Sequence, residues 1–206
     1  MILTGQASRF GWSALAVIVF LTPAFAAKVD FETVPLGTSF GGTFGNNPGD
    51  VVLTQDGINM SVENFHLNTF TGFFKAQVGG QYDDAFPTTP LSMDNINAKF
   101  DFSGLGFAVT QVTLEYAEFG GGNNFAVNGG PIVEIAPLSS LSPDVAPGVT
   151  AVADDHSITL TGPISSFLIG GQELAIDNIV AVPEPATVAL LAVSGLAMGL
   201  HRRFRR

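Results

Sequence analysis

Residues 96–102 have the sequence INAKFDF, and residues 112–116 have the sequence VTLEY. In both stretches apolar and polar residues alternate, so that positions 96, 98, 100 and 102 are apolar and positions 97, 99 and 101 are polar. A period of two is typical of a β-strand with one buried face and one solvated face. The two stretches therefore predict strands rather than helices.

Shorter runs of the same kind recur between clusters of Gly, Pro, Asn and Asp, and no segment of the central region resembles a capped helix of more than two or three turns. Further strands are predicted at residues 29–31, 51–54, 58–65, 70–78, 125–127, 132–135, 149–152, 157–161, 165–169 and 174–182. Strands without alternating helices favour an all-β fold, an antiparallel β-sandwich and most simply a jelly roll, for residues 28–182. Residues 120–124 are predicted to form a flexible hairpin loop, and residues 137–147 a long exposed loop.

The composition excludes several classes of protein. The chain of 206 residues has no cysteine, which excludes disulfides, thiolate metal ligands and thiol nucleophiles. Residues 28–182 contain three lysines and 17 acidic residues, which gives a formal charge of −14. Such a surface repels phosphate backbones, so nucleic-acid binding is not expected. Divalent cations and neutral, hydroxyl-rich polymers remain compatible partners.

The N-terminal residues have the order of a secretory signal peptide. Arg9 precedes an apolar run over residues 12–21, and residues 24–26 have the sequence AFA, which suits a signal peptidase. We predict a signal peptide over residues 1–27, with cleavage near Ala26 or Ala27. A buried N-terminal helix and an uncleaved anchor are the alternatives.

The C-terminal residues have the order of a membrane segment followed by a basic tail. Residues 186–200 carry no charge, and the basic cluster Arg202, Arg203, Arg205 and Arg206 ends the chain. A helix of this length spans about 22 Å, and arginine side chains that reach the headgroups compensate for its shortness against a ~30 Å hydrocarbon core. We predict a single transmembrane helix over residues 186–200, with the arginines in the cytoplasm and the rest of the chain outside. An amphipathic helix docked on the domain is the alternative.

Pro183, Glu184 and Pro185 stand immediately before this segment. Together with the apolar segment and the arginines, they make residues 183–206 resemble the PEP-CTERM sorting signal of Gram-negative bacteria. The resemblance implies that an exosortase, a membrane-embedded cysteine protease-transpeptidase, is a partner and cuts the chain near the motif. It further implies an inner-membrane anchor with the domain in the periplasm, then a place at the cell surface or outside the cell, often alongside exopolysaccharide.

The two ends of the predicted domain have a second, looser resemblance. Residues 29–32 (VDFE) open the domain and residues 174–179 (LAIDNI) close it, which is similar to galactose-binding-like jelly rolls. In that fold the first and last strands are neighbours, and an acidic residue from each helps to hold a structural calcium ion. The resemblance implies Glu32 and Asp177 as the calcium ligands, completed by loop carbonyls. The alternative is that both residues act as turn formers at strand ends.

Catalytic motifs are not found in the predicted domain. Neither His66 nor His156 lies in a nucleophile elbow or a zinc pattern, so we expect no catalytic residue and a protein that is not an enzyme. The domain also lacks tryptophan, and Phe70, Phe73 and Phe74 are expected in the core. The sequence therefore predicts an exported structural or adhesive protein associated with exopolysaccharide. The alternatives are a calcium-stabilised carbohydrate-binding module and a secreted polysaccharide-active enzyme.

Overall fold

The structure, a computed structural model, describes residues 26–184, and these form an all-β fold without an α-helix. Three short 3-10 helices, η1 (Gly42–Phe44), η2 (Asp83–Ala85) and η3 (Leu138–Ser140), interrupt the strands. The described strands are β1 (Ala27–Val29), β2 (Ser39–Phe40), β3 (Val51–Gln55), β4 (Ile58–Leu67), β5 (Phe70–Gly72), β6 (Lys75–Val78), β7 (Leu91–Asp94), β8 (Ile96–Asp101), β9 (Val109–Val127), β10 (Val133–Ile135), β11 (Asp144–Ala146), β12 (Val149–Ala153), β13 (Ser157–Ile164) and β14 (Ser166–Pro183). The predicted all-β class is confirmed.

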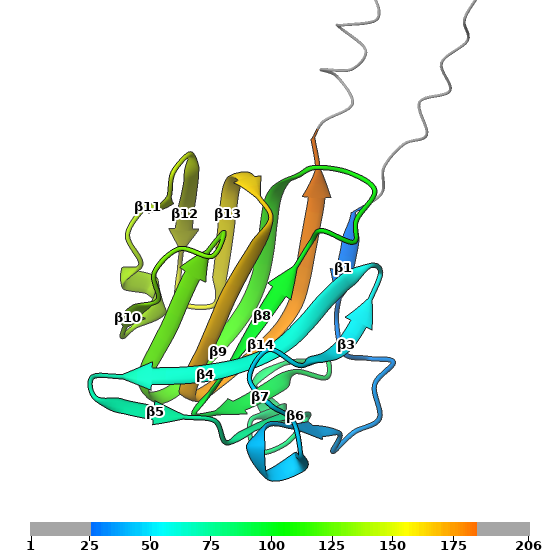
Figure 1. The fold of residues 1–206 in the computed structure, drawn as a ribbon, viewed down its shortest axis with the longest axis vertical. Coiled ribbons are helices and arrows are strands. Elements are labelled where there is room, and N and C mark those ends of the chain that lie inside the picture. The colour runs from blue at the N-terminus through cyan, green and yellow to red at the C-terminus, as the bar shows by residue number, and fades with distance from the viewer. Residues whose placement is uncertain (1–25, 185–206) are drawn as a thin grey trace, which may run out of the picture.

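Two long antiparallel strands, β9 and β14, connect the whole sheet. The first half of β14 pairs with β8 and the second half pairs with β7 and β1, while β9 pairs with β14 along both halves. From β9 the sheet continues through β13, β12 and β11, and from β7 through β6 and β2. β4 pairs with β8 and passes across the front of β9 and β14 in Figure 1. The result is one large antiparallel sheet that folds over its own core.

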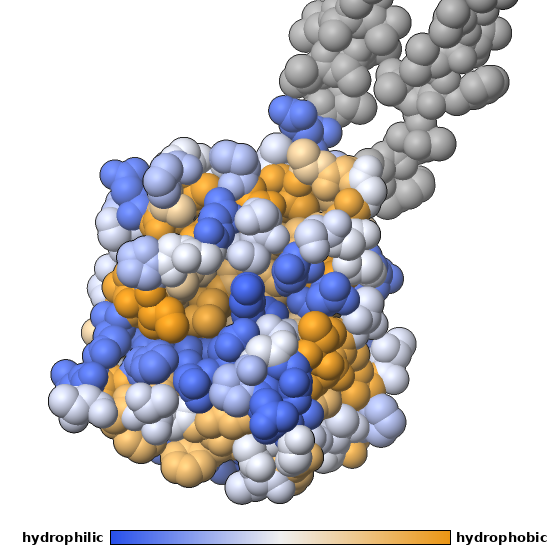
Figure 2. Space-filling view, viewed as in Figure 1, coloured by the Kyte–Doolittle hydropathy of each residue, from blue (hydrophilic) through white to orange (hydrophobic). Residues whose placement is uncertain are grey.

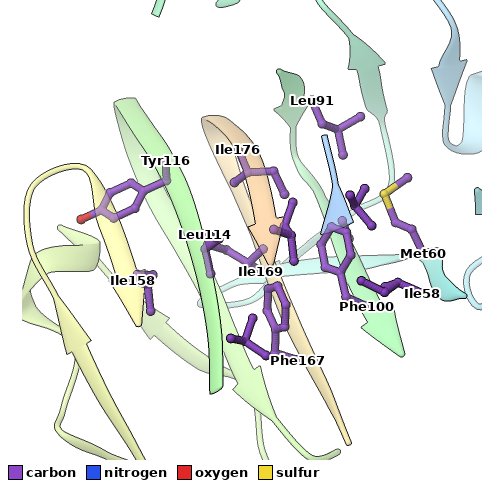
Figure 3. Close-up of a cluster of buried hydrophobic side chains, with 14 of the residues drawn as sticks. Ile58, Met60, Leu91, Phe100, Leu114, Tyr116, Ile158, Phe167, Ile169 and Ile176 are labelled. Atoms are coloured by element: carbon purple, nitrogen blue, oxygen red, sulfur yellow. The ribbon is translucent and has the colours of Figure 1, made fainter. Parts of the chain in front are cut away.

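The core consists of the inward side chains of this sheet. Figure 3 shows Phe100 of β8, Phe167 of β14 and Met60 of β4 among them. Phe100 and Phe167 stack with ring centroids 4.9 Å apart. The four apolar residues of the INAKFDF stretch are all buried, as the alternation predicts: Ile96, Ala98, Phe100 and Phe102. Burial of these side chains supplies the main driving force for the fold, at about 1.5–3 kcal/mol for each large one.

The first and last strands are neighbours, as predicted. Ala27 pairs with Ala181 and Val29 pairs with Ile179 in an antiparallel register. Both ends of the described chain therefore leave the domain at the same end, at the top of Figure 1.

The structure corrects two predicted loops, residues 120–124 completely and residues 137–147 in part. Residues 120–124 belong to β9, and Asn123 and Asn124 are buried there. Asn124 Oδ1 accepts from His66 N at 2.8 Å, 58 residues away in the sequence. Asn123 Nδ2 donates to Glu118 of the same strand, and Asn123 Oδ1 has no hydrogen-bond partner among the described residues. In the predicted loop 137–147, η3 buries Leu138 completely and β11 joins the sheet.

Candidate functional site

A groove lies beside the start of β13 and the middle of β9. It has a volume of about 690 Å³, and its walls come from residues 85–87, from residues 115–117 and 119 of β9 and from the turn at residues 154–157. Carboxylates from Glu115, Asp154 and Asp155 and the ring of His156 line it together with the phenyl rings of Phe86 and Phe119. The groove therefore combines aromatic faces with hydrogen-bonding groups, and its lining contains no lysine or arginine.

An aromatic pair forms one wall of the groove. Phe119 is 47% exposed, and its ring stacks on Tyr82 with centroids 4.2 Å apart and planes 10° apart. Tyr82 is buried beneath it, so the outer ring is held in one orientation. A fixed, half-exposed aromatic face is suited to stacking against an apolar face of a ligand.

The turn at residues 154–157 is held by its own aspartate. Asp154 Oδ1 accepts from His156 N at 2.9 Å and from Ser157 N at 2.6 Å, and these hydrogen bonds hold the pKa of Asp154 below its usual range. Tyr116 donates its hydroxyl to the carbonyl of Asp154. Burial, helped by the nearby carboxylates, raises the pKa of Tyr116 to about 12. Asp154 and Tyr116 thus fix the turn, and Asp155 and His156 stand exposed on it.

The two predicted calcium ligands, Glu32 and Asp177, meet at one short segment. Glu32 Oε1 accepts from Thr89 N at 2.8 Å, and Asp177 Oδ2 accepts from the hydroxyl of Thr88. Asp177 is completely buried, and its Oδ1 accepts from Asn178 N at 2.7 Å. Among residues 26–184 no group of three or more His, Cys, Asp or Glu side chains is arranged to hold a metal ion. Calcium binding by this pair stays a prediction.

Asp177 has an unusual environment for a carboxylate. Burial, with Glu115 and Glu32 nearby, raises its pKa from 3.8 to about 6 even though Thr88 and Asn178 donate hydrogen bonds to it. The side chain turns inward because Asn178 has a positive φ of 52° and the pairing of β14 with β9 shifts between Asp177 and Val180. The bulge therefore places an ionisable group in the interior.

Three further predicted features have mixed outcomes. Phe70 and Phe74 are 41% and 46% exposed, so their expected place in the core is wrong, whereas Phe73 is half-buried. His66 lies on β4 and His156 in a turn, as expected. Sequence reasoning missed the stack of Phe119 on Tyr82, because no local pattern relates two residues on separate segments.

The sorting motif begins inside the sheet. Pro183 is the last residue of β14 and pairs with Val109, and Glu184 N donates to Ala108 O at 3.2 Å. The described residues do not include Pro185, the predicted transmembrane helix at residues 186–200, the basic cluster at 202–206 or residues 1–25 of the predicted signal peptide. The predicted signal peptide ends at residue 27, but Ala27 begins β1 and pairs with Ala181, so the domain starts at or before this residue. Within residues 26–184 there is no helix that is long and apolar enough to cross a membrane.

Comparison with known families bears on the C-terminal end of the chain. Residues 181–206 match the PEP-CTERM protein-sorting motif, which confirms that prediction. No curated protein matches the chain.

Proposed function

Because residues 181–206 are a PEP-CTERM sorting motif, we propose that this chain is an exported surface protein that an exosortase cuts from its membrane anchor and that then binds polysaccharide without acting as an enzyme. Sorting and export rest on the motif. The binding role rests on the groove beside β9, and its single most telling feature is the exposed face of Phe119 on Tyr82.

The aromatic wall supports a sugar ligand. One face of a pyranose ring is largely apolar C–H surface, and it stacks on an aromatic ring that is already held in place. Phe119 meets this requirement because Tyr82 packs flat against its back at 4.2 Å. No further ordering of the ring is needed on binding, which reduces the entropic cost.

The polar wall supports the same class of ligand. The carboxylates of Asp155 and Glu115 accept hydrogen bonds from hydroxyl groups, and His156 both donates and accepts. Because the domain has a formal charge of −14, an acidic polysaccharide would be repelled. The ligand is therefore a neutral or amine-bearing polysaccharide.

The test is binding of the domain, residues 27–184, to neutral and amine-bearing glycans on an array and to exopolysaccharide from the host. Burying a phenylalanine is worth about 1.5–3 kcal/mol, so Phe119→Ala is expected to weaken binding about tenfold or more. Phe74→Ala is the matched control, because Phe74 is equally exposed at 46% but is not part of the groove. Equal losses in the two variants, or no glycan binding by the unaltered domain, would overturn the binding role.

A calcium-stabilised carbohydrate-binding module is a second candidate. It is favoured by the convergence of Glu32 and Asp177 on the consecutive residues Thr88 and Thr89. Asp177 pairs directly with Glu115, which lines the groove. An ion between Glu32 and Asp177 would thus brace one wall of the binding site.

A further inference from the structure

The predicted signal-peptide cut and the sorting motif lie side by side at one end of the domain. β1 begins at Ala27, which pairs with Ala181 of β14, and Glu184 follows three residues after Ala181. Figure 1 shows both chain ends leaving here, next to the loop that joins β8 to β9. The two apolar segments of the sequence, residues 12–21 and 186–200, are therefore attached to the same end.

The spacing in the sequence places this end close to the predicted anchor. Only Pro185 separates Glu184 from the uncharged segment that starts at Ala186. An extended chain covers at most about 3.6 Å per residue, so the segment starts within about 7 Å of Glu184. Glu184 itself is held to the domain through Ala108. When residues 186–200 are in the membrane, this end of the domain lies at the level of the headgroups.

The surface at this end is apolar and hollowed. A cleft of about 350 Å³ opens between residues 102–109 and the turn at residues 163–165. Leu105 and Phe107 are half-buried in its walls, and Ala108 and Pro163 are exposed. Figure 2 shows apolar surface at this end, next to the grey atoms of the chain ends.

The loop and the turn that line this cleft carry no charged side chain. Residues 102–114 and residues 157–172 contain no Asp, Glu, Lys or Arg, in a domain that carries 17 acidic residues. Bacterial membranes contain anionic lipid, which repels carboxylates. The carboxylates of Asp101 and Glu184 therefore flank this surface, and the loop and the turn that line the cleft contribute none.

We propose that this end of the domain, residues 102–109 and 163–165, contacts the phospholipid surface of the bilayer while the precursor is anchored. The inference rests on the proposed anchoring by residues 186–200. The contact holds Pro183 and Glu184 at the headgroup level, where a membrane-embedded protease reaches its substrate. Because this contact already brings the motif to the membrane surface, the domain needs no linker before Pro183.

The test places an environment-sensitive label at this end of the anchored chain. Because the protein has no cysteine, Ser103→Cys in the exposed 102–109 loop provides a single site for a nitrobenzoxadiazole label, whose emission rises in an apolar medium. Thr69→Cys, exposed in the turn between β4 and β5 at the far end in Figure 1, is the matched control. The signal-processed chain with its C-terminus intact is reconstituted into vesicles of phosphatidylethanolamine and phosphatidylglycerol. Equal thermal stability of the two variants confirms that neither label disturbs the fold.

The expected result is a several-fold rise in emission at position 103, with a blue shift and quenching by brominated lipid, and no change at position 69. If the chain floats with the vesicles and the emission of the label at position 103 does not rise, the lipid contact is refuted and the anchoring stands. If the chain does not float, the anchoring fails and the inference fails with it. A rise at position 103 that requires added exosortase would also refute the lipid contact and would assign the surface to the enzyme.

Discussion

Replacement of the buried Asp177 by asparagine is expected to stabilise the domain at neutral pH when calcium is absent. Asp177 is fully buried, and its pKa rises from 3.8 to about 6 on folding. At 1.36 kcal/mol per pKa unit, the ionised side chain costs the folded state about 3 kcal/mol. Asp177→Asn removes the charge and keeps an oxygen to accept from Asn178 N.

The sign of the pH dependence follows from the raised pKa. Between about pH 4 and pH 6 the folded protein holds a proton on Asp177 that the unfolded chain has lost, so the free energy of unfolding falls as pH rises through this window. Above about pH 6 the full penalty is present. The gain from Asp177→Asn is therefore expected to reach about 3 kcal/mol at pH 7.5 and to disappear near pH 4.

Urea unfolding with chelator, followed by circular dichroism, measures this difference. The comparison of the two proteins at pH 7.5 and pH 4.5 cancels the general repulsion of the acidic domain, which both share. A variant that is less stable than the unaltered protein at pH 7.5 in chelator, or a difference that does not change with pH, would refute the account of Asp177 as a buried charge whose hydrogen bonds from Thr88 and Asn178 do not offset its burial.

Three further outcomes are expected. Gly170→Ala is expected to lower the free energy of unfolding by about 3 kcal/mol or more, because a Cβ would overlap the backbone oxygen of Ile96 and the side-chain amide of Asn97. Gly106→Ala is its control, since a Cβ there meets open space, and it is expected to change stability in urea by less than about 0.5 kcal/mol. Leu138→Ala is expected to cost about 2–5 kcal/mol in the same assay, since the side chain is fully buried although it lies in a surface connection; a cost near zero would show that η3 is not docked. Under the calcium hypothesis, millimolar calcium raises the melting temperature of the unaltered domain, and Asp177→Ala and Glu32→Ala both abolish the rise; an equal melting temperature in calcium and in chelator rejects the site.

The strands that depend on local alternation could be predicted from the sequence, whereas the length of β9 and β14 could not. Gly120 to Asn124 has the composition of a loop, and pairing with β14 and β10 keeps it in the sheet. Asn124 is also bound to the backbone of His66, 58 residues away. Such non-local hydrogen bonds leave no pattern in the sequence near residue 124.

One part of the candidate site, the acidic pair, could be predicted from the sequence, and the other part, the groove, could not. Asp177 and Glu32 could be placed together because Asp177 lies in the last strand and Glu32 follows the first, and the resemblance to galactose-binding-like jelly rolls implies that these strands are neighbours. The groove could not be predicted, since its aromatic wall joins Tyr82 to Phe119 across the fold. The exposure of Phe70 and Phe74 was missed because phenylalanine is buried in most proteins.

The measurement that tests the central claim most directly is the intact mass of the protein from its host, grown with and without an active exosortase. The account predicts a mature chain that begins near residue 27 and has lost the arginines at 202–206 when the enzyme is present, and a membrane-bound chain that keeps them when it is absent. A protein that retains residues 202–206 in cells with an active exosortase, or that has the same mass in both strains, would contradict it.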